Sequence, residues 1–226
     1  MRSTSKPQAG EGWQRAHSAE QKEQRREAIL GAAAELFRER SMADISIGEV
    51  ADRAGLAKGS VYRYFSTKEE VFLALFIQAL GAWFEEVMPL LRGLSRDTSP
   101  YDVAALVVRT LAPREPMLRL LASNSCDIEQ NLSPEAARAS KRWELEHIVL
   151  AGDAFEAALP ALPEGGGVRA ILRLGALISG LWPMGHPVGP MKKVLSAPKM
   201  APLRVDFYGE LESSFGALLA GMCRAS

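Results

Sequence analysis

A short stretch of the chain, KGSVYRYF at residues 58–65, gathers several hydrogen-bond donors. Lysine and tyrosine side chains donate to phosphate oxygens, and an arginine can also bind the edge of guanine. Gly59 has no side chain, so another molecule can approach the backbone closely there. The polar members are Lys58, Ser60, Tyr62, Arg63 and Tyr64. This chemistry suits a surface that binds nucleic acid, and the alternative is an ordinary solvated helix.

Two short predicted helices position these side chains. Residues 47–54 carry apolar side chains at helical spacing, after a Ser46–Glu49 capping-box pattern, and Gly55 follows as a stop signal. Residues 58–65 form the next predicted helix, with Val61 and Phe65 one turn apart and facing inward. Two helices joined by a tight turn are typical of a helix-turn-helix, whose second helix enters the major groove.

The rest of the sequence is also helical in pattern, and no alternating run predicts a strand. We expect an all-α fold of about nine helices. The first 20 residues are expected to be a flexible tail, followed by a first helix with an apolar stripe at Ile29, Ala33, Leu36 and Phe37. A long apolar helix begins near residue 67 and connects the first three helices to a helical body. Residues 183–202 are rich in proline and predict an irregular connection with a short helical turn around Met191–Leu195.

The overall charge excludes a protein that coats nucleic acid unspecifically. The chain has 27 basic and 27 acidic residues, so any nucleic-acid binding must come from a local patch. Residues 1–68 hold twelve Lys or Arg against nine Asp or Glu, a net charge of +3, and the remainder carries −3. The two cysteines lie far apart and the three histidines are scattered, so we expect no metal site, no cofactor and no disulfide framework.

One uncharged segment, residues 174–191, could be mistaken for a membrane span. It contains four glycines and three prolines, and the prolines fall within eight residues. A spanning helix must close its backbone hydrogen bonds internally, so this segment is predicted to be the end of a buried helix followed by a loop. The N-terminus lacks the apolar core of a secretory signal, and we expect a cytoplasmic protein without a membrane partner.

The first third of the sequence resembles the DNA-binding domain of the TetR (tetracycline-repressor-like) family of bacterial regulators. The resemblance runs from about Arg25 to Glu70, through AILGAAAELFRER and SIGEVADRAGLAKGSVYRYFSTKEEVF. It implies a transcriptional regulator, most often a repressor released from operator DNA by a small molecule. The positions that the resemblance assigns to DNA binding are Arg25, Ser46, Lys58, Gly59, Ser60, Tyr62, Arg63, Tyr64 and Lys68.

Two residues depart from the family pattern. Ser41 stands where a glycine usually follows the first helix, which predicts a strained left-handed serine. Ala57 stands where a serine or threonine usually precedes the recognition helix, so a side-chain cap is missing. We therefore expect a recognition helix that frays easily.

The resemblance also implies a domain organisation and a homodimer. Residues 1–20 would be the flexible tail, residues 21–68 the helix-turn-helix domain, and residues 69–226 a helical effector-binding and dimerisation domain. The last two long helices, near 165–182 and 204–222, would form the dimer. Their apolar stripes either face a partner or face the chain's own core. These stripes consist of Leu174, Leu177, Ile178 and Leu181, with Gly175, Ala176 and Gly180 beside them, and of Phe207, Leu211, Phe215 and Leu218.

A small-molecule effector would bind among the middle helices, in a largely apolar site with few polar anchors. The alternative is that the two tryptophans are simply core residues and the histidine is structural. The candidate effector-binding residues are Asn124, Glu129, Trp143, His147 and Trp182.

A different class of function, an enzyme with a thiol site, would need Cys126 close to His147 and to Asp127 or Asp153. Nothing in the spacing of these residues favours it, and we expect no catalytic residues. A purely structural helical module is disfavoured by the cluster at 58–68. Steep loss of DNA affinity with salt would separate these classes.

Overall fold

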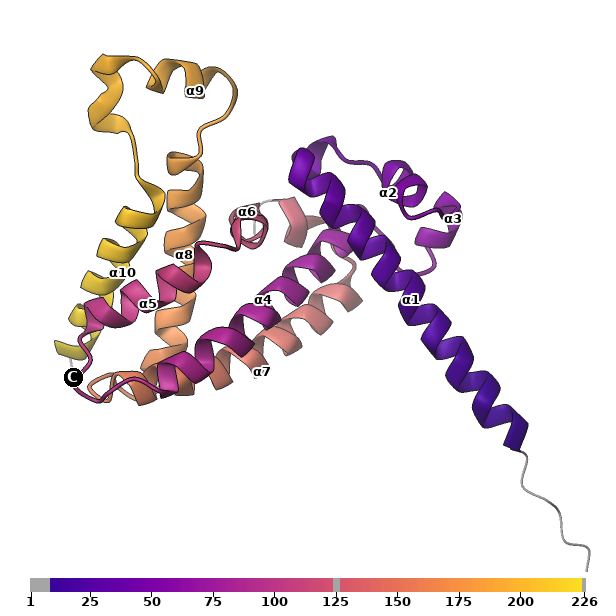
Figure 1. Cartoon of the computed structure of the whole chain (residues 1–226), viewed down its shortest axis with the longest axis horizontal. Coiled ribbons are helices and arrows are strands. Elements are labelled where there is room, and N and C mark those ends of the chain that lie inside the picture. The colour runs from indigo at the N-terminus through magenta and orange to yellow at the C-terminus, as the bar shows by residue number, and fades with distance from the viewer. Residues whose placement is uncertain (1–8, 124–126, 225–226) are drawn as a thin grey trace, which may run out of the picture. The chain divides into compact units, whose positions relative to one another are not determined.

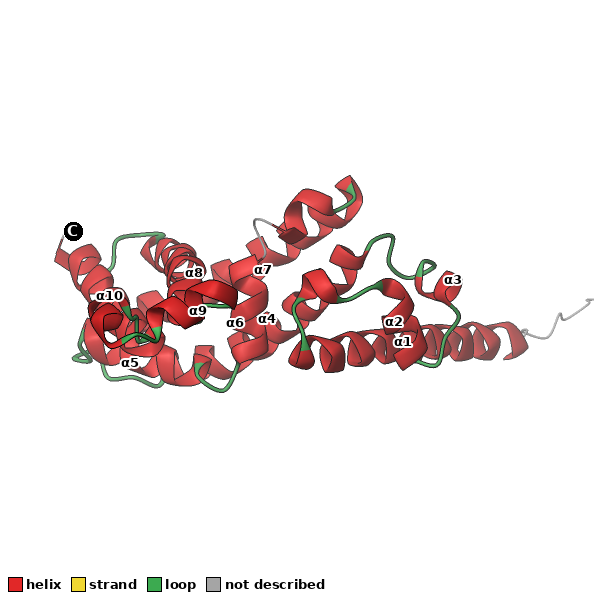
Figure 2. Ribbon diagram, turned by 90° about the horizontal axis from the view of Figure 1, so that it is seen from above, coloured by secondary structure: helices red, strands yellow, loops and turns green. Residues whose placement is uncertain are grey.

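The computed structural model describes residues 9–123 and 127–224, and in these ranges it contains helices and loops but no strand (Figures 1 and 2). The described part has ten α-helices, which agrees with the predicted all-α fold. Their bounds are α1 Ala9–Glu39, α2 Ile47–Arg53, α3 Lys58–Val61, α4 Lys68–Arg92, α5 Pro100–Leu111, α6 Glu115–Ser123, α7 Pro134–Ala158, α8 Gly166–Gly185, α9 Gly189–Leu195 and α10 Phe207–Arg224. Three short 3₁₀ turns add η1 Met42–Asp44, η3 Glu129–Asn131 and η4 Pro198–Leu203.

The chain divides into two compact units, Met1–Phe72 and Leu73–Ser226. The division falls inside α4, one helical turn after the predicted boundary at 68/69. Each unit has its own buried apolar side chains, and α4 is the continuous covalent link between them.

The first unit is built on the apolar stripe of α1. All four predicted stripe residues are buried, and Phe37 packs against Phe72 with ring centroids 5.6 Å apart. Val50 of α2 and Val61 of α3 are fully buried, and Phe65 is nearly so. These contacts fix α2 and α3 against α1 because each helix buries the one apolar stripe that its sequence provides.

Two sequence predictions for this unit were wrong. Helix α1 begins at Ala9, so residues 9–20 are helical although the whole segment 1–20 was predicted to be a flexible tail. Ser41 is extended, with φ −74° and ψ 155°, because α1 ends at Glu39 and the chain continues into η1 without a left-handed residue. The strain expected at Ser41 is therefore absent.

The second unit packs α5 against α10, and α8 against α6, α7 and α10. Helices α7 and α8 cross at two glycines, where a Cβ built on Gly167 would lie 2.0 Å from the carbonyl oxygen of Gly152. Gly165, with φ +69°, makes the turn into α8, and Glu156 accepts a hydrogen bond from the Gly167 amide at 3.0 Å. The glycine run thus begins α8 and allows it to approach α7 closely.

The stripes that we predicted to form a dimer are mostly buried within the chain itself. Leu174 and Ile178 of α8 and Phe207, Leu211 and Phe215 of α10 are buried in the second unit. The alternative prediction, that these stripes face the chain's own core, is correct for these five residues. The exposed face of α8 instead carries Leu172, Ala176 and Gly180.

Helix α4, rather than residues 174–191, is long and apolar enough to cross a membrane by length and composition. Within its apolar window, 44% of the residues are buried. The core helix of a water-soluble protein passes the same test, so this helix alone is weak evidence for a membrane span. Its apolar faces meet Phe37 in the first unit and line a cavity in the second.

Candidate nucleic-acid interface and ligand cavity

The start of α2 is fixed by the predicted capping box. Ser46 Oγ accepts a hydrogen bond from the Glu49 amide at 3.3 Å, and the Ser46 amide donates to Glu49 Oε2 at 2.9 Å. Arg40 adds an ion pair to Glu49 Oε1 at 2.9 Å. The Ser46 amide, followed by Arg40, lowers the pKa of Glu49 from 4.5 to about 2. A carboxylate at this helix start stays ionised because both partners favour its charged form.

The predicted helix over residues 58–65 is α-helical only over Lys58–Val61. Beyond Val61 the chain continues as a turn, in which the Arg63 amide donates to the Ser60 carbonyl and the Tyr64 amide to the Val61 carbonyl. These two bonds span three residues, whereas the Phe65 amide donates to the Val61 carbonyl across four residues at 3.1 Å, so the turn mixes 3₁₀ and α-helical bonds. Ala57 makes no side-chain cap, as its residue type predicts. The second helix of this pair is therefore one short α-helical turn followed by a turn that is only partly 3₁₀.

The polar side chains of α3 and the following turn are presented outward. Lys58, Gly59, Tyr62 and Arg63 are exposed, and Tyr62 has 49% of its surface accessible. Ser60 and Tyr64 are half-buried. The Arg63 guanidinium donates to Ser60 Oγ at 3.2 Å, which joins two of the predicted DNA-binding side chains on one face. Since Val61 and Phe65 are buried, the outward face of this element is entirely polar apart from Gly59 and the tyrosine rings.

Three other predicted DNA-binding residues have partners or positions that the sequence did not indicate. The Lys68 ammonium donates to the Met42 carbonyl at 2.9 Å, so it links the first turn of α4 to η1. Ser46 Oγ, besides its capping bond, donates to Glu49 Oε2 at 2.9 Å. Arg25 lies well inside α1 and is exposed, because α1 begins far earlier than predicted.

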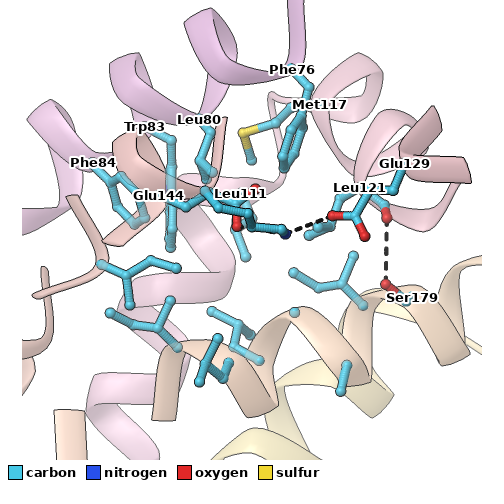
Figure 3. Close-up of a pocket in the computed structure, with 18 residues that line it drawn as sticks. Phe76, Leu80, Trp83, Phe84, Leu111, Met117, Leu121, Glu129, Glu144 and Ser179 are labelled. Carbon is cyan, nitrogen blue, oxygen red and sulfur yellow. Dashed lines mark hydrogen bonds and ion pairs between the residues drawn. The ribbon is translucent and has the colours of Figure 1, made fainter. Parts of the chain in front are cut away.

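The second unit contains a cavity of about 410 Å³. Its walls are mostly apolar, and Figure 3 shows side chains of α4 facing those of α8 across it. Trp83 does not offer its ring N–H to the cavity, since Nε1 donates to Thr110 Oγ1 at 2.9 Å and Thr110 donates to the Val107 carbonyl. The lining residues that Figure 3 labels are Phe76, Leu80, Trp83, Phe84, Leu111, Met117, Leu121, Glu129, Glu144 and Ser179.

One end of the cavity is polar. Lys141 Nζ lies 2.7 Å from Glu129 Oε1 and 2.8 Å from Glu144 Oε2. Burial lowers the pKa of Lys141, but the hydrogen bonds to Glu129 and Glu144 outweigh burial and the net shift is upward. The lysine is therefore cationic and lies between the two carboxyl groups. Glu129 and Phe84 lie at opposite ends of the cavity in Figure 3.

The candidate effector-binding residues are not brought together. Glu129 lines the cavity, whereas Asn124 lies outside the described residues. Trp143 stacks on His147 with ring centroids 3.9 Å apart, and a Cβ on Gly81 would lie 3.3 Å from the Trp143 ring, so this pair packs α7 against α4.

Trp182 is likewise outside the cavity lining. Its ring stacks on His186 at 3.7 Å and meets Phe207 edge-on at 5.0 Å. The two histidines make the same local contact, because the ring Nδ1 of each lies close to the carbonyl oxygen of the tryptophan four residues earlier, at 2.8 Å for His147 and 3.1 Å for His186. Both tryptophan–histidine pairs pack helices together. Cys126, the cysteine of the possible thiol site, lies outside the described residues.

Sequence reasoning missed most of the cavity lining. The available signal was the apolar stripe of α4, which is wider than one packed face needs. Four of its residues, Phe76, Leu80, Trp83 and Phe84, line the cavity. Lys141 and Glu144 are three residues apart on α7, a spacing that predicts an ion pair but does not place it at a cavity.

Two family profiles match the chain, one on each side of residue 76. Residues 29–75 match the profile described as bacterial regulatory proteins, tetR family. Residues 77–225 match tetracyclin repressor-like, C-terminal domain. The second match alone covers more than half of the chain.

Two curated relatives match stretches of about a quarter of this chain. The fatty acid metabolism regulator protein of Bacillus subtilis (strain 168) is 32% identical over 59 residues, 26% of this chain and 30% of that protein. The HTH-type transcriptional activator FasR of Mycolicibacterium smegmatis is 41% identical over 54 residues, 24% of this chain and 25% of that protein. The chain thus spans less than a third of the length of either relative.

Solved structures share the fold over most of the chain. The fatty acid degradation regulator FadR from Bacillus halodurans has a TM-score of 0.54 at 16% identity and covers 86% of this chain and 97% of its own. The regulator FadR from Bacillus subtilis, solved in complex with stearoyl-CoA, has a TM-score of 0.50 at 19% identity and covers 85% and 96%. At these identities the likeness concerns the fold.

Proposed function

The chain belongs to the tetR family of bacterial regulatory proteins and is a DNA-binding transcriptional regulator, and from this premise we propose that it is a homodimeric, cytoplasmic repressor released from its operator by an apolar ligand. Two copies of the helix-turn-helix would bind the two halves of a pseudo-palindromic site. The ligand would occupy the cavity of the second unit. This regulatory role, rather than catalysis, is what we propose for the chain.

The proposed DNA-binding surface is supported by the polar outward face of α3 and of the turn after it. Lys58, Tyr62 and Arg63 are exposed together, above a buried Val61. We infer that Lys58, Ser60 and Arg63 face the bases and that the two tyrosines hold phosphates, with Gly59 allowing close approach. Arg25, Ser46 and Lys68 complete the proposed contacts. Lys68 keeps further N–H groups for a phosphate beside its bond to the Met42 carbonyl, since an ammonium has three donors.

The proposed ligand has a long apolar chain, such as a fatty acyl group. A cavity of about 410 Å³ with apolar walls and one polar end suits such a molecule. The names of the relatives support the same class, since two regulate fatty acid metabolism or degradation and one structure holds stearoyl-CoA. The name of the second relative, a transcriptional activator, supports activation as the alternative to repression.

We infer that α4 transmits the ligand signal. The helix lines the cavity through Phe76 and Phe84, and its first turn is tied to η1 through Lys68. A ligand that moves α4 would alter the spacing of the two recognition elements in the dimer. Operator affinity would then fall by linkage, because the ligand binds one arrangement of the protein better than the other.

Genomic footprinting of the tagged protein, followed by mobility-shift titration of the recovered operator, tests this proposal. Arg63→Ala and Tyr62→Ala should each weaken operator binding by about tenfold or more, as expected for removed base and phosphate contacts. The matched control is Arg38→Ala, which removes an exposed arginine of the same unit outside the proposed surface. Equal operator affinity for all three variants would refute the proposed surface, and a weak dependence of affinity on salt would contradict phosphate binding.

A further inference from the structure

The segment between α8 and α10 is a structured projection. We call residues 186–205 the arm; it contains α9 and η4. Figure 1 shows the arm extending beyond the neighbouring ends of α8 and α10. The predicted helical turn around Met191–Leu195 is part of α9, and η4 adds a second helical element that the sequence did not predict.

The arm is held in shape by hydrogen bonds and by a packed base. The Arg204 side chain donates to the carbonyl oxygens of Leu195 and Ser196, both at 2.7 Å, and to that of Ala197 at 3.0 Å. These carbonyls close α9, where a cation is favourable. At the base, a Cβ on Gly185 would lie 2.7 Å from the Cβ of Phe207, so α8 and α10 meet closely there. A segment ordered in this way loses little conformational freedom when it binds a partner.

The arm exposes apolar side chains among positive charges. Val188 has 79% and Leu203 64% of its surface accessible, and Met191 and Val194 are more than half exposed. Lys192 and Lys193 lie beside them, and residues 165–205 contain no aspartate or glutamate. Together with Met184, the arm borders a hollow of about 450 Å³, and Pro187 is one of the arm residues that line it. Such a concentration of exposed apolar surface is uncommon on a monomer and marks an interaction site.

A second exposed apolar cluster lies on the same unit. Leu145, Val149 and Leu150 of α7 are all exposed, and Leu145 has 65% of its surface accessible. Exposed Glu146 and Asp153 lie within one helical turn of both Val149 and Leu150. We call this set the α7 surface. Its acidic flank is opposite in charge to the lysines of the arm, although Arg142 also lies near Leu145.

We propose that the arm of one subunit docks on the α7 surface of a second copy of this chain. Among the described residues, eight of the twelve large exposed hydrophobic side chains belong to the arm with Met184 or to the α7 surface, so these are the apolar surfaces left to cover. A two-fold dimer buries both at once, since each copy supplies one arm and one α7 surface. The arm joins α8 to α10, the two helices proposed to dimerise, so its contact extends the same interface. The inference rests on the proposed dimer.

Sedimentation analysis of the full chain gives the first test. The variant that combines Val188→Ser, Met191→Ser and Val194→Ser should dimerise about tenfold or more weakly, because dimer formation then no longer buries these three apolar side chains. Leu90→Ser, an exposed apolar residue outside both surfaces, is the matched control and should leave the equilibrium unchanged. An unchanged equilibrium for the triple variant would overturn the proposal.

Charge reversal tests the pairing of the two surfaces. Lys192→Glu with Lys193→Glu, and separately Glu146→Lys with Asp153→Lys, should each weaken the dimer. The chain carrying all four changes should recover most of the lost affinity, because the opposite charges are then restored with reversed sign. Additive weakening in the combined variant would show that the surfaces do not meet.

Cross-linking tests the contact directly, in a background in which Cys126 and Cys223 are serine. A chain with Met191→Cys and a differently tagged chain with Val149→Cys, mixed and oxidised, should yield a disulfide-linked product that carries both tags. Leu90→Cys in place of Val149→Cys should yield none. A monomeric wild-type chain would refute the proposed dimeric function itself. A wild-type dimer that gives no mixed product would refute only the docking of the arm. The same conclusion would follow if the arm bound anionic phosphatidylglycerol vesicles and no mixed product formed.

Discussion

At the scale of single residues, the sequence predicts only some of the side-chain contacts that hold the helix-turn-helix together. Ser46 and Glu49 form the capping box that their spacing predicts, but Arg40 joins them from the end of α1. Lys68 was predicted to hold a phosphate, and its bond to the Met42 carbonyl gives it a structural role as well. A variant at Lys68 therefore changes both the fold of the first unit and the proposed contact, whereas a variant at Arg63 loses only an exposed hydrogen bond to Ser60 beside the proposed contact.

Glu49→Gln should lower the stability of the first unit near neutral pH and have no effect at low pH. Glutamine keeps the shape of the capping box but not the charge that Arg40 pairs with. The folded-state pKa is lowered from 4.5 to about 2, so the ionised form stabilises the fold above pH 4.5 and this contribution is lost as the pH falls towards 2. Thermal unfolding of both proteins across this range measures the difference. A gap in melting temperature that stays constant down to pH 2 would contradict the assignment.

At the scale of elements, helix packing depends on glycines at particular crossings. Gly152 and Gly167 let α7 and α8 approach until no Cβ fits between them, whereas Gly175, on the same helix α8, has open space around it. The three glycines are indistinguishable in the sequence by type, since each lies in or beside an apolar helix. Their roles follow from what faces them, and this separates a packing glycine from one that borders a cavity.

Gly167→Ala should destabilise the second unit by about 1–3 kcal/mol, because the new methyl group would overlap the Gly152 carbonyl and force the helices apart. Gly175→Ala is the matched control. It meets no atom within 4 Å and should be neutral or stabilising by about 0.5–1 kcal/mol, as alanine is the better helix former. Urea unfolding monitored by circular dichroism gives both values. Equal stability of the two variants would show that α7 and α8 do not cross as described.

At the scale of the whole molecule, the proposed function couples a ligand in one unit to DNA bound by the other. The coupling is reciprocal, so operator DNA must lower ligand affinity by the same factor by which ligand lowers operator affinity. Helix α4 is the covalent element common to both units, and its residues Phe76, Leu80, Trp83 and Phe84 line the cavity. The arm adds a third surface, which would tie the coupling to the dimer.

Gly175→Met should abolish the response to ligand and leave operator binding intact. Gly175 lines the cavity with no atom within 4 Å of a built Cβ, so a methionine can extend into the space that the ligand would fill. Palmitoyl-CoA titrated against the operator complex is the probe, with Gly175→Ala as the control that should still respond. Release of the Gly175→Met protein from DNA at the wild-type palmitoyl-CoA concentration would place the ligand elsewhere.

The sequence by itself determined the helical fold, the apolar stripe of α1, the capping box and the outward polar face of α3, because each depends on residues within one or two helical turns. The tertiary structure decided which apolar faces find partners within the chain. Leu174 of α8 and Phe207 and Leu211 of α10 belong to apolar stripes whose spacing suits a dimer or a core equally. Only the packing of the neighbouring helices places these residues in the core. For the same reason, periodicity marked Trp143 and Trp182 but could not show that each stacks on its own histidine outside the cavity lining. A helical period fixes the direction of a side chain about its own axis, and the packing of separate helices decides what that side chain meets.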